Sequence, residues 1–286
     1  MKETKNNTNM NSKKIILGTI LSLAMLTSCS KDDNENSFVS DAKVNATIDG
    51  INEDIFKIID DQFNEQANPV GSGKSTEVAT PYLPSCATVN TIVTGSTWTR
   101  TVVFDNCTLQ NGNVLDGTII ISGSTNFDTP SQTISYTFEN FHHNNILIEG
   151  NRTVLRTIQS TEALSTPHPV ANMDIDMTAT FPNGNVYHRV GNRIREMIEG
   201  YQTIHVWIDN VFLVTGNWTT TFPQGTRTTT ITTPLRVEMT CPHIVSGVLS
   251  IVRNDNTATL DFGNGECDNE ATFTSNGNTV TIILGN

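Results

Sequence analysis

From Leu83 to Asn286 the chain alternates between polar and apolar residues, most clearly from Met173 to Phe181. Successive side chains of a strand point to opposite faces, so this period of two predicts strands with one buried face. The pairs Asn111-Gly112, Asn183-Gly184 and Asn276-Gly277 accept the positive φ that tight hairpin turns require. We therefore expect residues 83–286 to form an antiparallel β meander, folded as a sandwich or as a curved, barrel-like sheet.

A different period precedes this domain. Within residues 38–67, apolar side chains recur every three or four positions, at Ile48, Ile51, Ile55, Ile58, Ile59 and Phe63. Asp49, Glu53, Asp60 and Asp61 fall on the opposite side. This pattern predicts an amphipathic helix that docks one face onto the β domain. Residues 68–82 are rich in Gly, Ser and Pro and are expected to form a linker.

The first residues of the chain are typical of an export signal. Lys13 and Lys14 precede an apolar segment, Ile15 to Leu26, that is too short to span a bilayer as a helix. Leu26-Thr27-Ser28-Cys29 resembles a bacterial lipobox, which implies removal of residues 1–28 and acylation of Cys29. Two or more acyl chains such as palmitate anchor a protein stably. The alternative is an ordinary cleaved signal peptide with an accidental cysteine.

The residues after Cys29 bear on location. Residues 29–37 are polar and are expected to form a flexible tether. Ser30-Lys31-Asp32-Asp33 resembles the short acidic export tag of Bacteroidota surface lipoproteins, which implies an outer-membrane protein facing the cell exterior. If this segment is only a tether, the alternative is a protein anchored on the periplasmic face of the outer membrane.

Charge limits the partners. The chain has 17 Lys+Arg against 29 Asp+Glu, a net charge of −12, and removing a lysine-rich signal peptide makes it more acidic. Such a chain repels nucleic acid. The expected partners are the membrane, through the lipid anchor, and a glycan, an anionic ligand or an outer-membrane protein.

Four cysteines remain after Cys29, namely Cys86, Cys107, Cys241 and Cys267. An even number in an oxidising compartment indicates disulfides. Three pairings are open, and we favour Cys86 with Cys107 and Cys241 with Cys267, because these pairs close short loops and bound segments that look like copies of each other.

Candidate binding residues are few. Arg189, Arg193 and Arg195 would share one face of a strand, where they could meet a phosphate or a sugar acid; pairing with the domain's own carboxylates is the alternative. Trp98, Trp207 and Trp218 could stack on sugars or pack in the core. Asp174 and Asp176 could contribute to a Ca²⁺ site, but such a site needs about six or more oxygen ligands. The loop 261–270 is rich in carboxylates but lacks the Asp-x-Asp-x-Asn-Gly order of a known calcium loop. We expect no metal and no cofactor.

Several segments resemble uncharacterised Bacteroidota surface lipoproteins with a lipobox, an N-terminal helix and a cysteine-bracketed β domain. The likeness is carried by Thr101 to Cys107, Arg193 to Tyr201, Val211 to Gly216, Cys241 to Gly247, Leu260 to Gly265 and Cys267 to Asn269. The resemblance implies an architecture and a location but no activity.

Motifs of catalysis are lacking in the sequence, which has no Gly-x-Ser-x-Gly elbow, no His-Glu-x-x-His pair and no phosphate-binding loop. We therefore expect a non-catalytic, lipid-anchored binding module of unknown ligand. The alternatives are a structural subunit that docks to an outer-membrane protein complex and a hydrolase that acts on extracellular glycans.

Overall fold

The computed structural model describes residues 30–67, 82–203 and 206–284. It contains one long helix, α1 (Ser30–Ala67), and a short 3-10 helix, η1 (Trp207–Asp209). The strands are β1 (Thr88–Thr94), β2 (Thr97–Thr108), β3 (Val114–Ser124), β4 (Ser131–His143), β5 (Ile146–Glu149), β6 (Asn151–Gln159), β7 (His168–Thr180), β8 (Val186–Glu199), β9 (Val211–Phe222), β10 (Gly225–Glu238), β11 (Ile244–Arg253), β12 (Asn256–Asn264), β13 (Glu270–Ser275) and β14 (Asn278–Ile283). The predicted signal peptide, Cys29 and residues 68–81 of the predicted linker lie outside the described residues.

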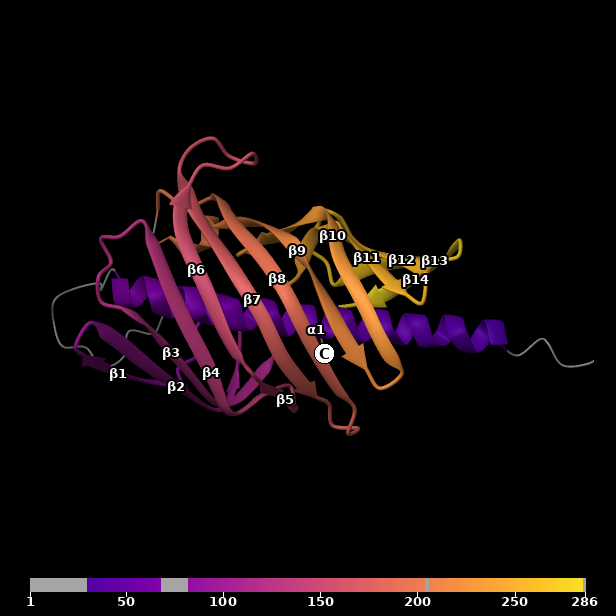
Figure 1. The fold of residues 1–286 in the computed structure, drawn as a ribbon, viewed down its shortest axis with the longest axis horizontal. Helices are drawn as coiled ribbons and strands as arrows, with labels where there is room; N and C mark the ends of the chain where they lie inside the picture. The colour runs from indigo at the N-terminus through magenta and orange to yellow at the C-terminus, as the bar shows by residue number, and fades with distance from the viewer. Residues whose placement is uncertain (1–29, 68–81, 204–205, 285–286) are drawn as a thin grey trace, which may run out of the picture.

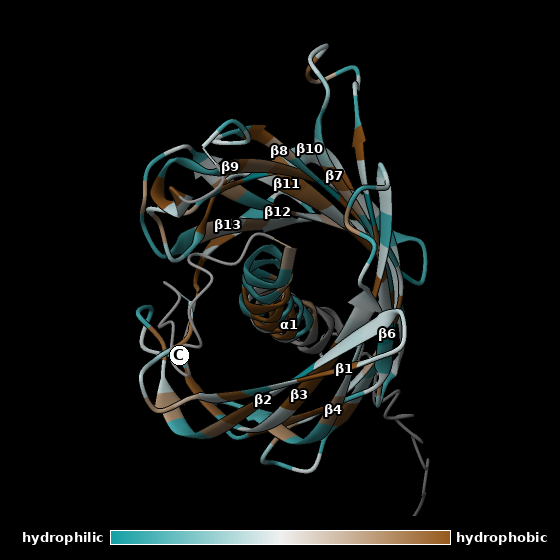
Figure 2. Cartoon of the chain, turned by 90° about the vertical axis from the view of Figure 1, so that its left-hand side faces the viewer, coloured by the Kyte–Doolittle hydropathy of each residue, from teal (hydrophilic) through white to brown (hydrophobic). Residues whose placement is uncertain are grey.

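All fourteen strands belong to one antiparallel sheet in which nearly every strand pairs with its neighbours in sequence. The exception lies between β4 and β7, where β5 and β6 each pair with both strands: β6 lies along the start of β7 and β5 along its end. This confirms the predicted mainly β meander with one N-terminal helix. Of the two forms left open by the sequence, the structure has the curved sheet, which surrounds α1 on most sides (Figures 1 and 2).

The predicted turns are also present. Gly112, Gly184 and Gly277 have φ values of 84°, 82° and 81°, and each lies between two adjacent strands. Residues that accept positive φ therefore reverse the chain where the sequence indicates.

The six apolar side chains that predicted the helix are all buried. They pack in a core cluster with the first half of the sheet, where Phe63 lies 6.5 Å from Trp98 between ring centroids. Nearer the start of α1, Phe38 packs edge-on against Phe273 of β13, at 5.6 Å, in a second cluster formed with β8 to β14. One helix thus joins two core clusters, and each buried Ile or Phe contributes about 1.5–3 kcal/mol.

Two features of α1 differ from the prediction. The sequence predicts a flexible tether over 29–37, whereas the helix continues back to Ser30; no Pro or Gly in this segment interrupts it. The sequence also predicts an acidic face on the side of α1 away from the sheet. Asp49 and Glu53 are instead buried, because the sheet curves around α1 and places arginines opposite them.

Both favoured disulfides are confirmed, with Cα–Cα distances of 5.7 Å in each. Cys86–Cys107 ties the segment before β1 to the end of β2, and Cys241–Cys267 ties the β10–β11 connection to the β12–β13 connection. In the loop-entropy model each bridge contributes about 3 kcal/mol.

Glycines allow the strands to bend at two tight points. Gly117 of β3 has a φ of 99°, and a Cβ there would lie 2.2 Å from the carbonyl oxygen of Asn140. Gly247 of β11 has a φ of 113°, and its Cβ would lie 2.6 Å from the carbonyl oxygen of Pro234. The strand register shifts at both positions, so these bulges help to curve the sheet.

We predict that Gly117→Ala lowers the free energy of unfolding by about 1–3 kcal/mol or more, because it combines backbone strain with a steric clash. Gly50→Ala is the matched control: Gly50 lies in α1 with open space around it, so alanine should raise stability by about 0.5–1 kcal/mol. Urea unfolding followed by tryptophan fluorescence measures both. Equal effects of the two substitutions would contradict the role of the bulge.

Candidate functional site

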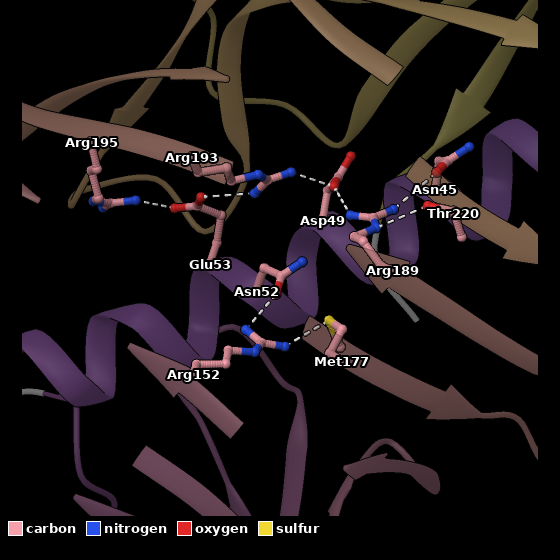
Figure 3. Close-up of polar contacts among 10 residues, drawn as sticks. All are labelled: Asn45, Asp49, Asn52, Glu53, Arg152, Met177, Arg189, Arg193, Arg195 and Thr220. Atoms are coloured by element: carbon pink, nitrogen blue, oxygen red, sulfur yellow. Dashed lines mark hydrogen bonds and ion pairs between the residues drawn. The ribbon is translucent and has the colours of Figure 1, made fainter. Parts of the chain in front are cut away.

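The concave face of the sheet meets α1 through buried arginines. Arg189, Arg193 and Arg195 lie on the inward face of β8 and are 0%, 0% and 2% exposed. On α1, Asn45, Asp49 and Glu53 are spaced by four residues, which places them on one helix face, toward β8 (Figure 3).

The three β8 arginines are held by carboxylates of α1. Arg189 and Arg193 both pair with Asp49, and Arg193 and Arg195 both pair with Glu53. Arg189 also donates to the side-chain oxygens of Asn45, at 2.9 Å, and Thr220, at 3.2 Å. We call these β8 arginines with Asp49 and Glu53 the ionic row.

An aromatic side chain supports the ionic row from the sheet. The guanidinium carbons of Arg189 and Arg193 lie 4.9 and 4.3 Å from the ring centroid of Trp218. Gly191, between the two arginines, leaves room for Trp218, since a Cβ there would lie 2.5 Å from its Cα. Stacking of a guanidinium on an indole ring favours the charged form at a desolvated site.

Burial is the main influence on these charges. It lowers the pKa of Arg189 to about 10, although the adjacent Asp49 carboxylate opposes this, and the charge of Arg193 adds to it. At neutral pH the guanidinium is still charged, so it depends on its carboxylate.

The structure brings the three predicted arginines together, as the sequence indicates, and places them under α1. The anions that they meet belong to the chain itself, although to the helix and not to a neighbouring strand. An external ligand could reach these arginines only by displacing α1. Ligand binding by Arg189, Arg193 and Arg195 stays a prediction.

A second polar cluster surrounds Asp54, on another side of α1. Its carboxylate accepts hydrogen bonds from the side-chain amides of Asn111, at 2.9 Å, and Asn113, at 2.7 Å, and lies 2.9 Å from Nε2 of His143. Burial alone would raise the pKa of Asp54, but the hydrogen bond and charge of His143, the charge of Lys57 and the amide of Asn111 together hold it below the usual value. Asp54 is therefore ionised at neutral pH.

Next to Asp54 the surface is hollowed by a cavity of about 550 Å³. It is bordered by α1, the segment before β1, the β2–β3 connection, η1 and the β10–β11 connection. One wall is an aromatic pair, Tyr82 and Trp207, with ring centroids 5.3 Å apart in an edge-to-face arrangement. Because Lys57 lies at its border, we call this hollow the Lys57 cavity.

Lys57 differs from the other charged residues of this region. It is half-buried, and its ammonium makes no hydrogen bond or ion pair in the part of the chain that the structure describes. Burial lowers the pKa of Lys57, the carboxylates of Asp54 and Glu53 oppose this, and the charge of Arg195 adds to it. It also borders an adjoining hollow of about 160 Å³.

The three tryptophans separate in the structure. Trp98 and Trp218 are 0% and 1% exposed and belong to the two core clusters. Trp207 is half-buried and borders the Lys57 cavity. The sequence alone could not distinguish Trp207, since the feature that matters is its pairing with Tyr82, far away in the chain.

We compared the chain with protein-family models, curated proteins and solved structures. No match was found in any of the three comparisons. Within residues 30–67, 82–203 and 206–284, no helix is both long and apolar enough to cross a bilayer. In the same residues, no group of three or more His, Cys, Asp or Glu side chains is placed to hold a metal ion.

We predict that Asp49→Asn lowers the free energy of unfolding by about 3–5 kcal/mol, because Arg189 and Arg193 stay buried and charged without their shared carboxylate. Glu139→Gln is the control; Glu139 is exposed on β4 and forms no ion pair among the described residues, so its loss should change stability by less than about 0.5 kcal/mol. Guanidinium-induced unfolding measures both. A stability of Asp49→Asn within error of the control would rule out the ionic row as a structural lock.

Proposed function

We propose that this chain is a lipoprotein of the outer membrane, anchored through Cys29 and facing the cell exterior, whose β domain is a non-catalytic binding module. The observation that carries the proposal is the joining of α1 to the predicted anchor. The described part of α1 starts at Ser30, next to Cys29 in the sequence, and the helix runs from there into the sheet. In Figure 1 its N-terminal part extends past the strands, as expected for a stalk between a membrane and a domain.

The binding half of the proposal is supported by the Lys57 cavity. Its volume of about 550 Å³ is within the range of about 300–1,000 Å³ that is common for small-molecule sites. Its lining is shared about equally between apolar or aromatic side chains and polar or charged ones, so it can contact both an apolar body and a polar group of a ligand. The ionic row keeps α1, which forms one side of the cavity, in a fixed position.

A second candidate function is docking to an outer-membrane protein, and one observation favours it. The edge strand β1 contains no charged residue, and its side chains Ile92 and Val93 are each 57% exposed. Among the described residues, β1 pairs with β2 alone. An uncharged edge of this kind offers backbone hydrogen bonds to a strand of a partner.

We predict that Cys29→Ala abolishes incorporation of labelled palmitate and moves the protein from the membrane fraction to the soluble fraction. Lipid anchoring needs the thiol of Cys29, and Ser28→Ala, which keeps a small residue before the cysteine, should behave as the wild type. Protease treatment of intact cells then tests the location: cleavage of the β domain without lysis is expected. Protection until lysis would place the protein on the periplasmic side, and an unlabelled wild type would refute the anchor.

A further inference from the structure

We infer that the Lys57 cavity binds a small ligand that carries an acidic group on a flat, apolar body. This inference rests on the binding half of the proposed function and is independent of the lipid anchor. Three observations support it: a cation without a partner, neighbouring carboxylates that are already engaged, and an aromatic wall beside a hydroxyl without an acceptor.

The unpartnered cation is Lys57. The residue is half-buried and borders the two adjoining hollows. Burial disfavours a charged amine unless an anion or hydrogen-bond acceptors replace the lost water. An acidic ligand would supply both, whereas a neutral ligand could supply hydrogen-bond acceptors but no opposite charge.

Neighbouring carboxylates fill this role only in part: Asp54 and Glu53 favour the charged form of Lys57, but neither forms an ion pair with it among the described residues. Asp54 accepts hydrogen bonds from Asn111 and Asn113 and pairs with His143, and Glu53 pairs with Arg193 and Arg195. These donors offset the negative charge that would otherwise repel an acidic ligand. The arrangement leaves Lys57 as the cation available to one.

The hydroxyl of Tyr82 is a further unsatisfied donor of this region. Its hydroxyl is buried and has no hydrogen-bond partner within the described residues, and burial raises its pKa well above the usual value, so it keeps its proton. A buried donor without an acceptor costs about 1–3 kcal/mol. The oxygens of a carboxylate, sulfonate or phosphate are suitable acceptors for an ammonium.

The shape and polarity of the cavity lining indicate what the non-acidic part of the ligand is like. Tyr82 and Trp207 meet edge to face, and Leu83, Leu109 and Met239 also border the cavity. Aromatic rings and thioethers favour contact with flat, apolar groups. A fully hydroxylated neutral sugar could stack on the ring wall and accept a hydrogen bond from the ammonium, but it would bring no opposite charge.

The test uses two probes of equal size, naphthalene-1-acetate and naphthalene-1-acetamide, which differ in charge. Isothermal titration of the full chain carrying Cys29→Ala, with both disulfides formed, gives the two affinities. We expect the acetate to bind about tenfold more tightly than the amide, the ratio that ~1.4 kcal/mol represents. Lys57→Met should remove this preference without changing the amide's affinity. Lys57→Arg should keep it, because the charge remains.

Two further variants locate the effect. Lys43→Met removes an exposed lysine of the same helix and should change neither affinity. Trp207→Ala should weaken both probes, because it removes part of the aromatic wall. Circular dichroism in the aromatic region verifies that each variant is folded.

Failures of the two proposals give different results. Equal affinities for the acid and the amide would overturn recognition of the acidic group by Lys57, and so would a preference that survives Lys57→Met. If Trp207→Ala still weakens binding of both probes in that case, the Lys57 cavity remains a binding site. If neither probe binds, or if Trp207→Ala has no effect, the Lys57 cavity is not the binding site and both proposals for it are wrong.

Discussion

A charged side chain that leaves water is stable only where an opposite charge is held within reach, and this requirement determines how α1 lies in the sheet. Moving the helix by one turn in one direction would place Lys57 opposite Arg195, two like charges. Moving it in the other direction would place the neutral Asn45 between Arg189 and Arg193. Apolar contacts tolerate small slips far better than buried ion pairs do. The ionic row therefore fixes the register of α1, while the two core clusters supply most of the stabilisation.

Much of this architecture could be predicted because it depends on local patterns. Alternation predicted the strands, Asn-Gly pairs predicted the turns, and the spacing of Ile48 to Phe63 predicted the helix. The burial of the acidic face could not be predicted, because Asp49 and Arg189 are separated by 140 residues and neither position has a local signal of the other. His143 illustrates the same limit: its neighbours suggest an exposed hairpin end, yet it is buried beside Asp54.

The candidate site was harder to predict than the fold for a related reason. The Lys57 cavity is assembled from five separate parts of the chain, and its aromatic pair joins Tyr82 with Trp207. The arginines that stood out in the sequence are instead used inside the protein. Glu53 connects the two regions, since it pairs with Arg193 and Arg195 and also borders the smaller hollow next to Lys57. The position of α1 along the Lys57 cavity thus depends on the same ion pairs that hold the helix in the sheet.

Both disulfides lie next to that cavity. Cys86 directly follows Ser85, which borders it, and Cys241 is itself part of the lining. In the cytoplasm, where glutathione keeps thiols reduced, both bordering loops would lack their covalent ties and would sample many conformations. The cavity would then be complete only in the oxidised chain, so any affinity that it confers would depend on the redox state of these four cysteines.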